Sequence, residues 1–386
     1  MSERINVCVI GLGNCASSLI TGSVSYAKNK SLIGITYEKV GPYNVDSLDF
    51  VLGFDVDCRK VGKTVDEAIL QKPNCTPMLC THEELKSSSI KFGKVYKGPV
   101  LDGVAEHMLE YPEDNAFRVD GTASLDENEI LILLKANAVD VIVNYLPVGS
   151  QKAVEFWANM CLKANIPMMN CMPIFIASDP EWAQRFKDAN LPICGDDMRS
   201  QFGASVLSSR IQSLLLERGL KTKCHIQQNF GGNTDFLNMM DKTRLKSKKI
   251  SKENVIKNEY SIADKEKGDD FLFAGPSDYI SYYGDTKVAY IHIEAENFGG
   301  QPVVLDCKLS VTDSANSAGV VIDSVRFLKV AHRLGMKGAI LGPSAFYQKT
   351  PPVALPFEEA KKMCDELAAV NIFPDGAKVS LWEGID

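Results

Sequence analysis

The chain has 386 residues, which is enough for two domains of about 100–200 residues each. Its net charge of -7 disfavours nucleic acid as a partner, because binding a phosphate backbone requires a basic face. No apolar stretch approaches the ~18 residues that a membrane span requires. The start carries no visible secretion signal, and the eleven cysteines are dispersed. These features predict reduced thiols and a cytoplasmic protein.

Short apolar segments alternate with helical patterns through the first half of the chain. Such alternation is typical of a parallel, doubly wound α/β sheet of the Rossmann type. Asp179 followed by Pro180 marks one helix start, as an N-cap and a first-turn proline. The expected strands span residues 5–10, 48–54, 139–143 and 166–171, and the expected helices span residues 14–28, 127–137, 151–165 and 180–190.

The pattern changes after a helix expected at 202–218. Residues 287–296 and 303–311 alternate between apolar and polar, which predicts a hairpin in a largely antiparallel sheet with one buried face. Helical periodicity returns over 314–334 and 357–369. We therefore expect a Rossmann-type domain of residues 1–200 plus 314–386, interrupted by an α+β insertion of residues 201–313. The charged stretch 254–268 is expected to be a loop.

The segment GLGNCA follows the first expected strand and opens a helix. Gly11 permits a tight turn, Gly13 lets the backbone approach a pyrophosphate, and Ala16 allows close packing of helix and strand. Asp55 ends the second expected strand, where an acidic side chain would accept the ribose hydroxyls of NAD. It lies further along the chain than usual, which requires a loop inserted at 31–44. A purely structural glycine turn, and Asp55 as an ordinary strand-end cap, are the alternatives.

The segment GDDMRSQFGAS places two acids and then Ser200 and Gln201 before a helix. The free N–H groups of a helix start would hold a phosphate monoester. The alternative is that Ser200 merely caps its helix.

Four lysines are spread over a hundred residues of this acidic chain: Lys248, Lys252, Lys287 and Lys349. The first two are four residues apart, so on a helix they share one face. A solvated basic face is the alternative, but the neighbouring segment FGGNTDF predicts a polar turn at a strand end, where site residues gather. Oxidation of an alcohol by NAD acidifies the adjacent C–H bond, and the resulting enolate needs the cationic stabilisation that lysine supplies.

Several long blocks together resemble the myo-inositol-1-phosphate synthase (inositol-3-phosphate synthase) family, in its shorter bacterial and archaeal form. They include VIGLGNCASSL, NYLPVGSQKA, GDDMRSQFGA, NFGGNTDFLNM, RLKSKKISK, TDSANSAGVVIDSVR and AFYQKTPP. The resemblance implies conversion of glucose 6-phosphate to 1L-myo-inositol 1-phosphate with bound NAD. It further implies oxidation at C5, enolisation by loss of a C6 proton, aldol closure onto C1 and return of the hydride. It also implies a homotetramer, assembled through the insertion.

The resemblance also carries the site residues over by motif. It implies a catalytic set of Lys248, Lys252, Lys287, Lys349, Asp235 and Asp313. It implies a cofactor site of Gly11, Gly13, Asn14, Cys15, Asp55, Tyr145, Ser178, Asp197, Ser200, Asp235 and Lys248. It implies a substrate site of Ser200, Gln201, Asn233, Lys252, Lys287 and Lys349.

Two other functions stay open at this point. One is an NAD-dependent dehydrogenase of a phosphorylated sugar, and the other is a non-catalytic NAD-binding homologue. An assisting cation also stays open, because Asp197, Asp235 and Asp313 could ligate a metal or pair with lysine.

Overall fold

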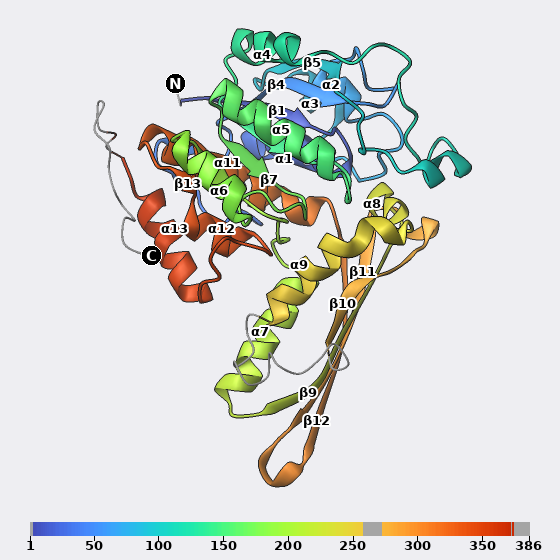
Figure 1. The fold of residues 1–386 in the computed structure, drawn as a ribbon, viewed down its shortest axis with the longest axis vertical. Helices are drawn as coiled ribbons and strands as arrows, with labels where there is room; N and C mark the ends of the chain where they lie inside the picture. Colours follow the sequence, from blue (N-terminus) through green and yellow to red (C-terminus); the bar gives the residue numbers. More distant parts are fainter. Residues whose placement is uncertain (1–2, 258–271, 372, 374–386) are drawn as a thin grey trace.

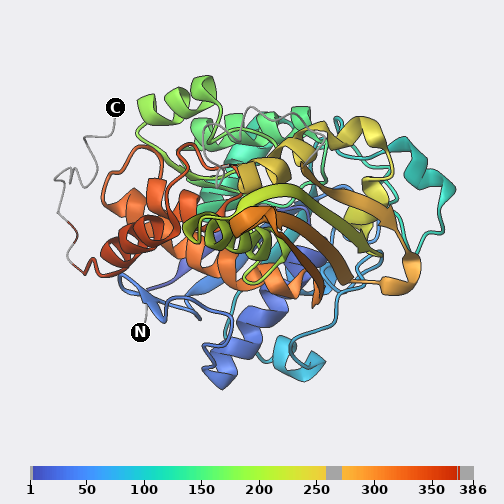
Figure 2. The same cartoon turned by 90° about the horizontal axis from the view of Figure 1, so that it is seen from below.

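The computed structural model describes residues 3–257, 272–371 and 373, without the side chains of residues 245–249, 254 and 257. Two sheets dominate it, one of seven strands and one of four. In Figure 1 the four-stranded sheet projects away from the seven-stranded layer, and Figure 2 shows it from below. Most of the loop expected at 254–268 lies outside the described residues, and residues 254–257 belong to a helix instead.

All pairings in the seven-stranded sheet are parallel. Its order is β13-β8-β7-β6-β1-β4-β5, so the chain reverses its direction of growth between β1 and β6. In doubly wound sheets, ligands bind beyond the carboxyl ends of the strands at such a reversal. The strands are β1 (Ile5–Ile10), β4 (Leu48–Asp55), β5 (Phe92–Lys97), β6 (Val141–Asn144), β7 (Met168–Asn170), β8 (Pro192–Cys194) and β13 (Gly338–Ala339).

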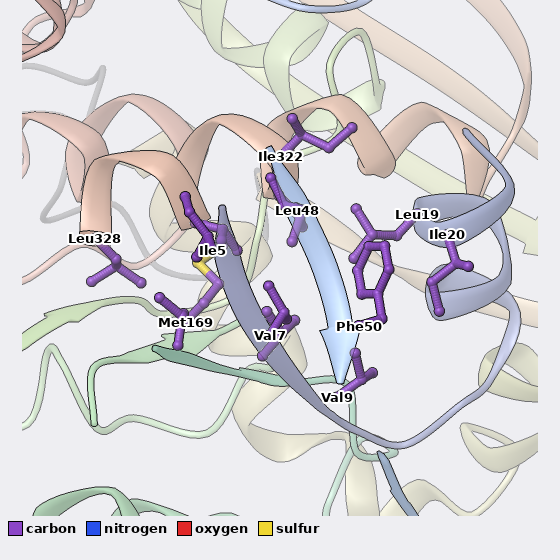
Figure 3. Close-up of a cluster of buried hydrophobic side chains, with 14 of the residues drawn as sticks. Ile5, Val7, Val9, Leu19, Ile20, Leu48, Phe50, Met169, Ile322 and Leu328 are labelled. Carbon is purple, nitrogen blue, oxygen red and sulfur yellow. The ribbon is translucent and has the colours of Figure 1, made fainter. Parts of the chain in front are cut away.

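Helices cover both faces of this sheet because its buried strands carry apolar side chains on both sides. On one face, Val7 and Phe50 pack with Leu19 of α1 (Asn14–Asn29) and Ile322 of α11 (Ala315–Arg333), as Figure 3 shows. The opposite face packs against three further helices through buried side chains such as Trp157. These helices are α4 (Glu127–Ala136), α5 (Gln151–Ala164) and α6 (Pro180–Asp188). Each large apolar side chain buried here contributes about 1.5–3 kcal/mol.

The capping signal before α6 is confirmed. Asp179 accepts hydrogen bonds from the N–H groups of Glu181 and Trp182, and Pro180 occupies the first turn. The expected insertion after α1 is also present, as residues 31–44 with the short strands β2 (Lys39–Val40) and β3 (Tyr43–Asn44).

A buried ion pair holds this insertion against α11. Arg326 pairs with Asp323 and donates to the carbonyl oxygens of Tyr37 and Glu38. Tyr347 donates from its hydroxyl to the same Asp323 at 2.8 Å, so the carboxyl-terminal part of the chain joins this contact.

The second sheet has the order β10-β9-β11-β12. It is mixed, because β9 and β10 are parallel while the other two pairings are antiparallel. The antiparallel expectation therefore holds for the hairpin of β11 and β12 and not for β10, which the sequence reasoning did not predict. The strands are β9 (Lys221–Gly231), β10 (Leu272–Tyr279), β11 (Thr286–Glu296) and β12 (Pro302–Thr312).

Two helices lie along this sheet in Figure 1, α7 (Ala204–Glu217) and α9 (Lys246–Lys257). Leu207 and Ile211 of α7 pack against Ile291 and Ile293 of β11, which confirms one buried face. The remaining α-helices of the described residues are α2 (Val65–Ala68), α3 (His82–Lys86), α8 (Thr234–Asn238), α12 (Leu341–Tyr347) and α13 (Phe357–Ala368).

The polar side chains on the inner face of β9 form a buried row. Gln227 accepts from Ser208 and donates to Asn229. His225, in the same row, is fully buried, and neither ring nitrogen has a hydrogen-bond partner in the described part of the chain. Burial lowers the pKa of His225 from 6.5 to about 4.

The buried imidazole makes stability depend on pH. The unfolded chain binds a proton at His225 below pH 6.5, whereas the folded chain resists protonation down to about pH 4. The free energy of unfolding should therefore lose about 3 kcal/mol as the pH falls across this range. His225→Leu should remove this loss. Urea unfolding of both proteins between pH 7 and pH 4 measures the difference, and parallel pH profiles would contradict it.

Candidate active site

Two cavities meet at the carboxyl end of β1. The larger has a volume of about 1210 Å³ including its opening to solvent, and the smaller has about 550 Å³. Gly13, Phe117, Tyr145, Leu146 and Pro147 line both. An elongated ligand that passes Gly13 can therefore occupy the two cavities together.

The smaller cavity is mainly apolar and lies between β1, β4 and the loop after β5. Gly11, Phe54, Asp55 and Trp157 are among its lining residues. Asp55 is 9% exposed. Its carboxylate accepts hydrogen bonds from the backbone N–H groups of Leu12 and Val56, each at 2.7 Å. Asp55 is thus a strand-end cap and a lining residue at once.

The glycines of the first loop have different surroundings. Gly11 has a φ of +85°, and a Cβ there would lie 2.8 Å from the carbonyl oxygen of Tyr145. Gly13 has no atom within 4 Å of a Cβ position and lines both cavities. The absent side chain of Gly13 leaves an open cradle at the start of α1, where unpaired helix N–H groups attract anions. A dinucleotide pyrophosphate fits this cradle.

The larger cavity collects polar groups from the whole length of the chain. Lys252 comes from α9, Lys287 from β11 and Lys349 from the segment after α12, and all three line it. The predicted residues Asn14, Cys15, Tyr145, Asp197, Ser200, Asn233, Asp235 and Asp313 line it as well. The structure therefore brings together most of the set expected from the sequence.

Carboxylates hold two of these lysines. The Nζ atom of Lys349 lies 2.7 Å from Asp197 Oδ1, and that of Lys287 lies 2.8 Å from Asp313 Oδ1. Ser251 donates to the other oxygen of Asp197 at 2.6 Å, so Asp197 connects α9 to the segment of Lys349. Charge-assisted bonds of this kind fix the positions of the ammonium groups.

The start of α7 forms another wall of the larger cavity. Gly203 is its N-cap, and Ser200, Gly203 and Ser205 line the cavity. The alternative that Ser200 caps this helix is therefore wrong. A helix of 14 residues directs its positive end here, which suits a phosphate.

Two predicted residues stand apart from this group, and a third is described only at its backbone. Gln201 does not line either cavity, because its amide donates to Thr36 at 3.1 Å in the insertion after α1. Ser178 is also absent from both linings and donates to Asp196 from its hydroxyl at 2.8 Å. The side chain of Lys248 lies outside the described residues, although its backbone belongs to α9.

Asp285 is a site residue that the sequence reasoning missed. It is 5% exposed and accepts from Asn233 at 3.0 Å and from the Ser314 hydroxyl at 2.8 Å. Burial and the nearby Asp313 raise the pKa of Asp285. Its position two residues before Lys287 was the available signal. Asp285 joins the turn after β9 to the start of α11.

Cys15 lies near this acidic group. Burial, with Asp313, Asp285 and Asp235, raises the pKa of its thiol to about 12. The thiol therefore stays protonated and serves as a neutral part of the wall. Within the described part of the chain, no group of three His, Cys, Asp or Glu side chains is arranged to hold a metal ion.

The different surroundings of Gly11 and Gly13 predict that substitution of Gly11 lowers stability and substitution of Gly13 weakens NAD binding. Gly11→Ala would force a side chain against Tyr145 at a positive φ, so the free energy of unfolding should fall by roughly 2–4 kcal/mol. Gly13→Ala should leave stability near the wild-type value but weaken NAD binding about tenfold or more, because the methyl group fills the cradle. Thermal unfolding and calorimetric titration with NAD measure both effects. Undiminished NAD binding by a folded Gly13→Ala variant would contradict the assignment of the cradle.

Known proteins are similar to this chain in sequence and in fold. A family model described as myo-inositol-1-phosphate synthase matches residues 203–314. The inositol-3-phosphate synthase of Mycolicibacterium smegmatis is 39% identical over 379 residues, which covers 96% of this chain and 98% of the relative. The inositol-3-phosphate synthase of Corynebacterium glutamicum is 39% identical over 368 residues, which covers 94% and 97%.

Solved structures share the fold of this chain. The crystal structure of Ari2 matches with a TM-score of 0.74 and 29% identity, over 95% of this chain and 99% of that one. The inositol-3-phosphate synthase from Caenorhabditis elegans shares the fold with a TM-score of 0.69 at 14% identity, over 98% of this chain and 88% of that one. From its sequence similarity along nearly its whole length, the chain belongs to the myo-inositol-1-phosphate synthase family.

Proposed function

We propose that this protein is an NAD-dependent inositol-3-phosphate synthase that converts glucose 6-phosphate to 1L-myo-inositol 1-phosphate. The observation that carries the proposal is the convergence of Lys252, Lys287 and Lys349 in one cavity that adjoins the open cradle at Gly13. When bound, NAD accepts a hydride from the sugar and later returns it, so the net reaction is an isomerisation.

The start of α7, with Ser200, is proposed to bind the sugar phosphate. Its helix N–H groups and positive end favour a dianion, and its first turn contains no acidic residue that would repel one. This location fixes one end of the sugar chain and leaves the carbons between the lysines.

The lysines are proposed to stabilise negative charge on the sugar oxygens. Removal of the C6 proton creates an enolate and ring closure creates a second oxyanion, and each is stabilised by an ammonium group held in advance. Asp313 holds the Nζ atom of Lys287 and Asp197 holds that of Lys349, so little reorganisation is needed during the reaction. The proton-transfer role of Lys248 rests on the family resemblance alone.

The chain is proposed to divide into a cofactor domain of residues 1–200 plus 314–386 and a catalytic and oligomerisation domain of residues 201–313. The two separate sheets support this division. A cytoplasmic location is proposed from the sequence. No described helix has the length and apolar character needed to cross a membrane.

The reaction is tested with NAD far below the glucose 6-phosphate concentration. Inositol phosphate should exceed the NAD supplied, and no net NADH should accumulate. Steady release of NADH would instead favour a sugar-phosphate dehydrogenase, and binding of NAD without any turnover would favour a non-catalytic protein.

Lys287→Met tests the oxyanion role directly. Loss of one positioned cation should lower kcat by about 10²–10³-fold, while NAD binding persists because the cradle at Gly13 is unchanged. Lys337→Met, at an exposed lysine, is the matched control and should retain full activity. Equal kcat values for the two variants would show that Lys287 takes no part in the reaction.

The proposed homotetramer has a structural support in β12. Within the described chain, β12 pairs with β11 alone, and Val304 on it is 56% exposed. An unpaired strand edge favours pairing with another chain. Light scattering should give the mass of four chains for the wild type and a smaller mass for Val304→Lys. Ile132→Lys, at an exposed apolar position of α4, should leave the mass unchanged. A monomeric wild type would contradict the proposal.

A further inference from the structure

A lysine outside the catalytic group occupies an unusual position. Lys60 has no exposed surface, although it lies in the loop after β4 and not in the core of a helix or strand. Burial of an ammonium group is costly unless partners satisfy it. Burial lowers the pKa of Lys60, and the neighbouring Asp55 and Asp57 oppose that shift.

The two hydrogen-bond acceptors of the Lys60 ammonium group lie in and beside the glycine loop. Its Nζ atom donates to the carbonyl oxygen of Leu12 at 2.9 Å and to Asn74 Oδ1 at 3.0 Å. It also lies 3.9 Å from Asp55 Oδ2. Lys60 therefore contacts Leu12, the residue between Gly11 and Gly13, although Lys60 itself lines neither cavity.

Both peptide groups of Leu12 are fixed in this way. Its N–H donates to Asp55 Oδ2 at 2.7 Å. Its carbonyl oxygen accepts from Lys60 and also from Asn74 Nδ2, at 2.9 Å. A trans peptide is planar, with the C=O of one residue directed opposite to the N–H of the next. Because the Leu12 carbonyl faces Lys60, the Gly13 N–H faces away from it, on the side of the open cradle.

We propose that Lys60 is a positioning residue for the cofactor pyrophosphate: it fixes the Leu12–Gly13 peptide so that the Gly13 N–H faces the dinucleotide, and it places a positive charge behind that peptide. The proposal rests on the NAD binding proposed above. It gives Asp55 a second task, because this carboxylate balances the buried ammonium and holds the other end of Leu12.

The position of Lys60 also separates it from the catalytic lysines. It does not reach the larger cavity, so it cannot stabilise charge on the sugar. Its removal should therefore affect cofactor affinity and leave the chemistry at saturating NAD largely intact.

The test uses Lys60→Met, which keeps the length of the side chain but removes its charge and its donors. Calorimetric titration of the purified protein should show NAD and ADP-ribose bound about tenfold or more weakly, with adenosine, which lacks phosphates, bound as by the wild type. The kcat at saturating NAD should stay near the wild-type value. Lys63→Met, three residues along the same loop, is the matched control and should bind all three ligands normally.

Each outcome has a defined meaning. Equal weakening of NAD and adenosine would show general damage to the cavity and overturn the proposal, as would unchanged NAD affinity. If Lys60→Met does not fold, Asn74→Ala tests the same carbonyl clamp from a half-buried residue and should weaken NAD and ADP-ribose but not adenosine. A wild type that fails to bind NAD would instead refute the proposed function.

Discussion

Repulsion between like charges is the constraint on which the candidate active site depends. Lys252, Lys287 and Lys349 line one cavity, and ammonium groups confined together repel one another unless opposite charges lie among them. Asp313 and Asp197 supply such charges at hydrogen-bonding distance. These pairs offset the repulsion and hold the ammonium groups of Lys287 and Lys349 in fixed positions.

The same pairs join parts of the chain that are far apart. Asp197 follows β8, Lys349 follows α12, and Ser251 of α9 donates to the same carboxylate. Asp285 makes a comparable junction between the turn after β9 and the first residues of α11. These contacts join segments that flank the two sheets. The positions of the charged groups in the cavity therefore depend on how these segments pack together.

A group of buried charges supports the glycine loop. Asp55 and Lys60 hold the two peptide groups of Leu12, so the glycine loop has a defined orientation before any ligand arrives. Such preorganisation reduces the entropy lost on binding. Charge pairs thus occur at two places in this protein: one group supports the glycine loop, and the other orients the lysines that line the larger cavity.

The sequence by itself determined the alternation of strands and helices, the glycine cradle, the α6 cap and the hairpin of β11 and β12, because each follows from local periodicity or turn chemistry. The family blocks also named most of the cavity lining. Only the tertiary structure decided that β10 pairs with β9 in parallel. It also decided that the Gln201 amide donates to Thr36 and that the Ser178 hydroxyl donates to Asp196. It alone revealed the buried roles of Asp285 and Lys60. Side-chain direction and burial depend on contacts between residues distant in the sequence, and a local pattern does not contain them.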